Sequence, residues 1–226
     1  MMRNHKPPKE FQIEDEVWER TLFWEEEPVL TLSLRRPKLP EDTPGLRRME
    51  RYYRQVAEQW KARWEGPLYA QAQAAAGQAR QSSRPFRPWE ATLTFTVTYR
   101  QEGLLSLYTD TFEYTGGVHG LTVRRGDTWQ VPSGIPRTLQ SFFPPRARWR
   151  SQIYGEIRRQ IQARIHSGES LFADDWEQRL VPEFDPERFY LTPNGIAVFY
   201  PLYAIAPYAE GIPVFLLPFP STEEAV

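Results

Sequence analysis

The sequence contains no cysteine among its 226 residues. This absence excludes disulfide bonds, thiolate catalysis, iron–sulfur clusters and zinc sites with cysteine ligands. Only three histidines are present. A zinc site usually takes about four ligands, mostly from His and Cys, so zinc here would depend on Asp and Glu. We therefore expect no metal and no cofactor.

Long hydrophobic runs are also missing. A membrane-spanning helix needs ~18 apolar residues in succession, and the apolar stretch from Ile196 to Phe219 is interrupted by Pro201, Pro207 and Glu210. No apolar segment follows the basic N-terminus, so a secretory signal is not predicted. As written, the sequence predicts a cytoplasmic protein without a membrane span. If it is a piece of a longer protein, an extracytoplasmic location is expected instead.

An excess of charge of one sign is the third missing feature, because the formal net charge is only −1. Nucleic-acid binding depends on a basic patch that neutralises phosphates. A local group of arginines does occur on one expected helix, and we interpret it as a solvated face: Arg146, Arg148, Arg150, Arg158 and Arg159. We therefore expect no nucleic-acid partner.

Apolar and aromatic residues, in contrast, are plentiful. They make up 40% and 14% of the sequence, respectively, which is typical of a folded protein with a substantial core. Alternating apolar and polar residues predict half-buried strands. The expected strands are residues 17–24, 28–36, 91–99, 104–114, 121–131 and 214–219, with a hairpin around Asn194-Gly195 between 189–191 and 196–200.

Two amphipathic helices are expected beside these strands. In the first, from Gly45 to Glu65, apolar residues recur every three or four positions, and Gly66-Pro67 is expected to end or kink the helix. These residues are Leu46, Met49, Tyr53, Val56, Trp60 and Trp64. The second helix runs from Pro145 to Ser167, with Gly168 as its C-terminal cap. Its apolar stripe is Trp149, Ile153, Ile157, Ile161 and Ile165.

Together these patterns predict an α+β fold, in which the two helices pack on an antiparallel sheet of about five or six strands. Residues 1–12 are expected to form a disordered tail and residues 13–88 a strand–helix lobe. Residues 89–220 form the main domain, and the loop at 82–88 is the boundary. We expect the lobe and the domain to make one compact unit.

The segment from Tyr114 to Gly120 is the most distinctive motif. Its glycines, Gly116, Gly117 and Gly120, permit close backbone approach and would suit an anion. Their spacing matches neither a phosphate loop nor a dinucleotide fingerprint, and no helix follows them. His119 is either a base or ligand, or a side chain that holds the turn. We interpret the segment as a connection between two strands.

A second candidate is the tyrosine-rich stretch from Tyr200 to Tyr208. Tyrosine suits recognition surfaces because it combines a large contact area with a polar tip, although core packing of a proline-rich strand is the alternative. The carboxylates Asp174, Asp175 and Glu177 lie close in sequence but are expected to be solvated, and no catalytic residue is assigned. The candidate ligand-binding residues are Tyr114, Gly116, Gly117, His119, Tyr203 and Tyr208.

Two separated motifs resemble the RsiV anti-sigma factor C-terminal domain family, over about residues 89–219. The first is Tyr114-Thr115-Gly116-Gly117 followed by His119-Gly120. The second is Phe189-Tyr190-Leu191-Thr192, then Gly195-Ile196, Tyr203, Ile205-Ala206-Pro207-Tyr208-Ala209 and Gly211-Ile212-Pro213. The same domain accompanies the catalytic domain of the peptidoglycan deacetylase PdaC. The resemblance implies the fold and a non-catalytic binding or sensor role.

In RsiV this region binds lysozyme and controls the release of a sigma factor. The present sequence shows no sigma-binding segment or membrane helix, so the signalling role is not expected. The resemblance implies an unknown protein or cell-wall-derived ligand. Two alternatives remain open at this point: a hydrolase that uses Asp or Glu with His119, and an intracellular interaction or assembly protein.

Overall fold

The computed structural model describes residues 11–169 and 171–220. Its contacts divide the chain into two compact units. Unit 1 holds the chain up to Phe95, with residues 109–122 and 131–134. Unit 2 holds residues 96–108 and 123–130 and the chain from Ile135 onward. The tail expected at residues 1–12 lies almost entirely outside the described residues.

A six-stranded sheet contributes to both units, in the order β1-β2-β3-β4-β5-β6. Its strands are β1 (Glu14–Trp24), β2 (Glu27–Lys38), β3 (Trp89–Gln101), β4 (Leu104–Tyr114), β5 (Leu121–Gln130) and β6 (Ile135–Pro136). The expected α+β class and sheet size are confirmed. The β2–β3 pair is parallel, because the helical segment between these strands returns the chain to the end at which β2 began.

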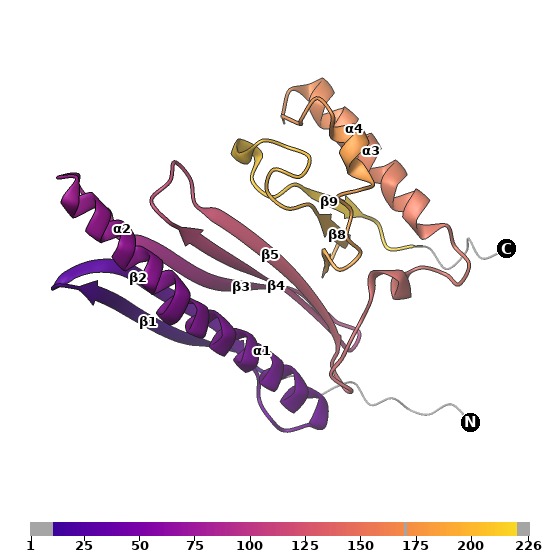
Figure 1. The fold of residues 1–226 in the computed structure, drawn as a ribbon. Coiled ribbons are helices and arrows are strands. Elements are labelled where there is room, and N and C mark those ends of the chain that lie inside the picture. Colours follow the sequence, from indigo (N-terminus) through magenta and orange to yellow (C-terminus); the bar gives the residue numbers. More distant parts are fainter. Residues whose placement is uncertain (1–10, 170, 221–226) are drawn as a thin grey trace. The chain divides into compact units, whose positions relative to one another are not determined.

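One long helical segment lies along β1 and β2 in unit 1 (Figure 1). It consists of α1 (Pro44–Arg63), the π-helical turn η1 (Trp64–Leu68) and α2 (Tyr69–Gln81). Thr43 caps its start, where the Thr43 side chain accepts a hydrogen bond from the Leu46 amide at 3.2 Å. Gly66-Pro67 does not end the helix, because the wider π turn accommodates a residue that lacks an N–H group.

The apolar face of this helical segment packs on alternate residues of β2 and β3. Leu30, Leu32 and Leu34 of β2 are at most 1% exposed. The register pairs them with Trp89, Ala91 and Leu93 of β3, so that all six share one sheet face. The helix side of this core is formed by Ala57, Trp64, Leu68, Ala72 and Ala76.

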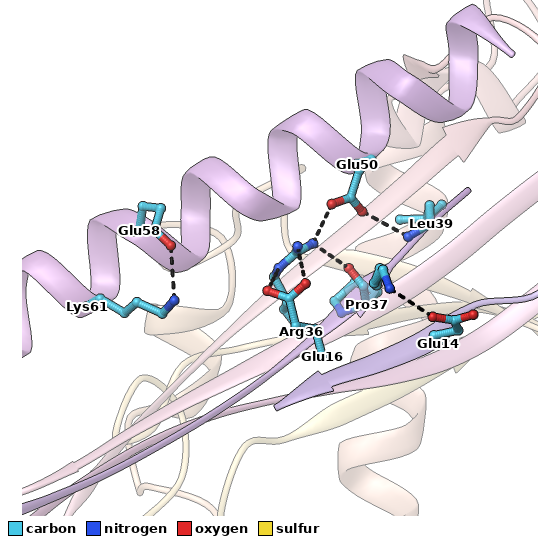
Figure 2. Close-up of polar contacts among 9 residues, drawn as sticks. Glu14, Glu16, Arg36, Pro37, Leu39, Glu50, Glu58 and Lys61 are labelled. Carbon is cyan, nitrogen blue, oxygen red and sulfur yellow. Dashed lines mark hydrogen bonds and ion pairs between the residues drawn. The ribbon is translucent and has the colours of Figure 1, made fainter. Parts of the chain in front are cut away.

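Unit 1 also buries an ion-pair cluster between β2 and α1 (Figure 2). The guanidinium of Arg36 donates to Glu50 Oε1 at 2.8 Å and binds both carboxylate oxygens of Glu16, at 3.1 and 2.7 Å. The second oxygen of Glu50 accepts the Leu39 amide at 2.8 Å. Because Arg36 and Glu50 are 5% and 4% exposed, each is stable there only with the other present.

Unit 2 contains a second sheet that the sequence did not separate from the first. Its order is β7 (Phe189–Thr192), β8 (Gly195–Phe199) and β9 (Val214–Leu217), all antiparallel. The expected hairpin is present, with Pro193 and Asn194 in its turn. Helix α3 (Trp149–Ser167) packs against this sheet, and the short α4 (Trp176–Leu180) follows it.

Helix α3 differs from its predicted form at its start and in the extent of its apolar stripe. It begins at Trp149 instead of Pro145, although Gly168 caps its end in the left-handed conformation as expected, with φ of +70°. Ile153, Ile157 and Ile161 are completely buried, but Ile165 is 46% exposed, so the stripe stops one turn early.

Polar side chains close both outer strands of the second sheet. On β9, the carbonyl of Leu216 accepts from Gln160 at 2.7 Å and that of Val214 from Arg164 at 2.8 Å. On β7, the Leu191 amide donates to the buried hydroxyl of Ser106 at 2.9 Å. Such contacts satisfy groups that an added strand would otherwise bind. Within residues 11–169 and 171–220, no helix is long and apolar enough to cross a membrane.

Candidate recognition loops

The candidate residues lie in two loops that belong to different compact units. Gly116, Gly117 and His119 belong to the connection between β4 and β5 in unit 1, and Tyr114 is the last residue of β4, directly before it. Tyr203 and Tyr208 belong to the connection between β8 and β9 in unit 2. We call these connections the glycine loop (residues 115–120) and the tyrosine loop (residues 200–213).

Glu113, at the end of β4, anchors the base of the glycine loop. Its carboxylate accepts two hydrogen bonds from Arg63, at 2.8 and 2.7 Å, and a third from Nε1 of Trp64 at 3.0 Å. Trp64 is fully buried. The hydrogen bonds to Glu113 raise the pKa of Arg63 above its ordinary value. The helical segment and β4 are thus joined directly before the loop begins.

Aromatic contacts hold the next part of the glycine loop. The guanidinium of Arg87 lies 4.8 Å from the centre of the half-buried Tyr114 ring, within the range of a cation–π contact. Gly116 has a φ of +83°, and a Cβ added there would lie 3.2 Å from Nε1 of Trp89. Glycine is therefore required at residue 116 for its backbone conformation and for the close approach of Trp89.

The other two glycines of the loop are not equivalent. A Cβ on Gly120 would overlap the ring of Phe112 and would lie 3.1 Å from the carbonyl oxygen of Glu113. A Cβ on Gly117 would meet only the carbonyl of His119, at an ordinary 3.7 Å. Gly120 thus sets the packing of the loop, and Gly117 does not. This geometry agrees with the interpretation of the segment as a shaped connection between strands.

The tip of the glycine loop is exposed to solvent. His119 is exposed, and Val118 is 90% exposed. His166 lies on α3 and the third histidine, His5, lies outside the described residues. Within the described part of the chain, no group of three or more His, Asp or Glu residues is arranged to hold a metal ion. The loop therefore presents a small, firmly anchored surface.

The tyrosine loop presents a pair of aromatic rings in contact. The ring centres of Tyr203 and Tyr208 are 5.6 Å apart and the ring planes are inclined by 33°. Tyr203 is 52% exposed and Tyr208 is half-buried. Tyr203 also has a φ of +65°, a left-handed conformation that is uncommon for a bulky residue.

The residues beside this pair belong to the core. Ala204, Ile205 and Ala206 are 8%, 0% and 3% exposed. The ring of Tyr200 is fully buried, its hydroxyl donates to the Leu180 carbonyl at 2.8 Å, and burial raises its pKa. The core-packing interpretation of this stretch therefore holds for Tyr200 and residues 204–206. Tyr203 projects from that buried frame into solvent.

Two hydrogen bonds hold a neighbouring segment, residues 171–175, against the tyrosine loop. The Ala173 amide donates to the Ile205 carbonyl at 3.0 Å, and the Leu171 amide donates to Glu210 Oε1 at 2.6 Å. Leu171 itself is 64% exposed. Sequence reasoning missed Leu171 and Glu210, because no periodicity marks either one and 39 residues separate them.

The three carboxylates noted in the sequence follow Leu171, and all are exposed. Asp175 forms an ion pair with Arg179 at 2.8 Å, and Glu177 lies 3.9 Å from Arg158. Asp174 has no ion-pair partner among residues 11–169 and 171–220. The structure therefore places these groups on the surface of unit 2, as the sequence indicated.

Comparisons with known families match the chain in two consecutive parts. A family model described as "Deacetylase PdaC" matches residues 26–122, which include the glycine loop. A second model, described as "Protein of unknown function (DUF3298)", matches residues 140–220, which include the tyrosine loop. No functionally curated protein matches the sequence.

Two solved structures are similar over nearly the whole chain. A DUF3298 family protein from Pseudomonas aeruginosa PAO1 is 18% identical with a TM-score of 0.60, covering 96% of this chain and 93% of its own. A DUF3298 family member from Bacteroides fragilis NCTC 9343 is 16% identical with a TM-score of 0.69, covering 95% and 92%. At this level of identity the likeness shows a shared fold.

Proposed function

We propose that this protein is a non-catalytic recognition domain, similar to the ligand-binding region of RsiV, whose ligand is a protein or a cell-wall-derived molecule. The observation that carries the proposal is the aromatic pair of Tyr203 and Tyr208. An exposed aromatic pair on a rigid frame is the kind of surface on which a few side chains supply most of the binding energy.

The backbone of Tyr203 adds to this argument. A left-handed conformation at a bulky residue costs on the order of 1–3 kcal/mol, and such residues gather at ligand-binding positions. Here the cost is sustained by the buried residues that follow, Ala204 to Ala206. A glycine or asparagine would adopt the same backbone with less strain. The tyrosine side chain therefore has a use that outweighs its strain.

The family matches cover both of the loops that carry the proposal. The stretch that carries the tyrosine loop matches the DUF3298 model, and the stretch that carries the glycine loop matches the PdaC model. Both loops also supply the residues that resemble RsiV. A sensor-type domain built on this fold needs an exposed contact surface, and the tyrosine loop supplies one.

Calorimetric titration tests the proposal with two probes, lysozyme and solubilised peptidoglycan fragments. We expect one of them to bind, and Tyr203→Asn to weaken that binding at least about ten-fold, as removal of an interface anchor does. Val118→Ser, which changes the exposed tip of the glycine loop, is the matched control and should leave the affinity unchanged.

Two results would contradict this proposal. The first is binding of either probe that Tyr203→Asn leaves intact and Val118→Ser weakens. The second is turnover of the fragments that disappears in His119→Ala, which would establish the hydrolase alternative. Thermal unfolding of each variant should accompany the titrations, so that loss of binding is not confused with loss of folding.

A further inference from the structure

We infer that the tyrosine loop and the segment 171–175 together form a docking surface for a basic segment of a partner protein, with an arginine side chain stacked on Tyr203. This inference rests on the proposed function and specifies the chemistry of the partner. We call the surface formed by Leu171, Asp174, Tyr203, Tyr208 and Glu210 the tyrosine surface.

The first support is the apolar character of the tyrosine surface. Leu171 and Tyr203 are 64% and 52% exposed, which is unusual for two large apolar or aromatic residues on loops held side by side. The hydrogen bonds from Ala173 to Ile205 and from Leu171 to Glu210 fix the two segments against each other. A partner would therefore meet a surface that is largely ordered before binding.

The second support is the local balance of charge. Residues 189–220 contain no Lys, Arg or His, and residues 167–178 contain four carboxylates and no basic side chain: Glu169, Asp174, Asp175 and Glu177. Arg179 and Arg158 pair with two of these, Asp175 and Glu177. Asp174 has no ion pair within the described chain, and Glu210 accepts a neutral backbone N–H group.

A further basic side chain of unit 2 is also occupied. Arg164 donates to the carbonyl of Val214 at 2.8 Å, and its guanidinium lies 5.0 Å from the centre of the Phe215 ring. It thus binds β9 and the core side of the sheet. The negative charge of Asp174 and Glu210 is left for a partner, which favours a cationic one.

Arginine fits the tyrosine surface better than other cations do. A planar guanidinium stacks on an aromatic face and at the same time donates hydrogen bonds to a neighbouring carboxylate. Arg87 on Tyr114 and Arg164 on Phe215 already make cation–π contacts within this chain. An uncharged sugar would also stack on Tyr203 and its hydroxyls would donate to Asp174, but it would leave the negative charge there unneutralised.

The test uses the full chain and a fluorescein-labelled peptide of alternating arginine and glycine, followed by fluorescence anisotropy. We expect saturable binding that weakens with salt. Tyr203→Asn should weaken it about five-fold through the lost cation–π contact. Asp174→Asn should weaken it about three-fold, as expected for an exposed charge pair.

A matched variant separates this surface from general attraction. Asp185→Asn removes an exposed carboxylate of the same unit that pairs with Arg188, and it should leave the affinity unchanged. Binding that resists Tyr203→Asn, or that falls equally with Asp185→Asn and Asp174→Asn, overturns the inference. So does a failure of the peptide to bind. If peptidoglycan fragments then bind in a Tyr203-dependent way, the proposed function stands and only the basic partner is lost.

Discussion

The glycine loop and the tyrosine loop are both exposed connections between strands, but they are held in opposite ways. The glycine loop is fixed by polar and ring contacts, from Glu113 to Arg63 and from Trp89 to Gly116. The tyrosine loop is fixed by buried apolar residues, and its Tyr203 ring is exposed. One loop thus uses its special residues to keep its shape, whereas the other presents them to solvent.

This difference shows that the residues that identify a family need not be the residues that bind a ligand. The glycine loop is the more distinctive motif because its backbone tolerates few residue types at 116 and 120. Such a constraint arises from packing and needs no ligand. Tyr203 has no comparable packing role, since 52% of it is exposed. A binding site is therefore better sought at a residue, such as Tyr203, whose backbone is strained and whose side chain does not pack in the core.

Gly120→Ala in the glycine loop is expected to have the largest effect on stability. The new Cβ overlaps the ring of Phe112, so the ring or the loop must move. We expect the free energy of unfolding to fall by about 2 kcal/mol, the usual cost of overpacking. Urea unfolding monitored by tryptophan fluorescence measures it.

The matched control is Gly117→Ala in the same loop. Its Cβ meets nothing closer than 3.7 Å, so the change should stay within about 0.5 kcal/mol. If the two variants are equally destabilised, the glycines do not set the loop shape through packing. The distinction between the two loops would then lose its basis.

Glu113→Ala tests the polar anchor of the glycine loop. It leaves the indole N–H of the buried Trp64 without its acceptor and releases Arg63. We expect a loss of about 1.5 kcal/mol, most of it from the unsatisfied N–H group, because Arg63 is 51% exposed and its ion pair is screened by solvent.

Glu58→Ala is the control for this anchor, because Glu58 is 63% exposed and pairs with Lys61 on the same helix. A surface pair of this type contributes about 0.3 kcal/mol. Chemical denaturation of both variants gives the comparison. Equal losses would show that Glu113 acts only as a surface charge.

In contrast to the changes in the glycine loop, Tyr203→Asn should raise the free energy of unfolding. Asparagine adopts the left-handed conformation with φ of +65° more readily than tyrosine does, so we expect a gain of about 0.5 kcal/mol. Tyr208→Asn relieves no positive φ and should lower stability. If Tyr203→Asn is as destabilising as Tyr208→Asn, the Tyr203 ring belongs to the core.

Much of this fold is predictable because its signals are local. Alternation placed β4 at Leu104–Tyr114, and helical spacing found the buried Ile153, Ile157 and Ile161. Two features depend on contacts between residues that are far apart in the sequence. The parallel β2–β3 pair depends on where the long helix returns the chain, and the separate second sheet depends on Gln160, Arg164 and Ser106 closing its outer strands.

The candidate site was only partly predictable for the same reason. Tyr203 and Tyr208 are close in sequence, so the tyrosine-rich composition of that stretch was enough to identify them. Leu171 and Glu210 come together only through a hydrogen bond across the fold. The positive φ of Tyr203 is likewise set by its buried neighbours and leaves no mark in the sequence.

His119→Ala should have the smallest effect on stability, and it tests whether the glycine loop takes part in binding. His119 lies on the exposed tip of the glycine loop, so its loss removes little buried area. We expect a slightly lower melting temperature, which corresponds to a loss of less than about 0.5 kcal/mol in the free energy of unfolding. Differential scanning calorimetry measures the shift. Because the tyrosine loop is the proposed contact surface, binding of the arginine peptide should be unchanged. A His119→Ala protein that melts normally yet binds no ligand would move the site to the glycine loop.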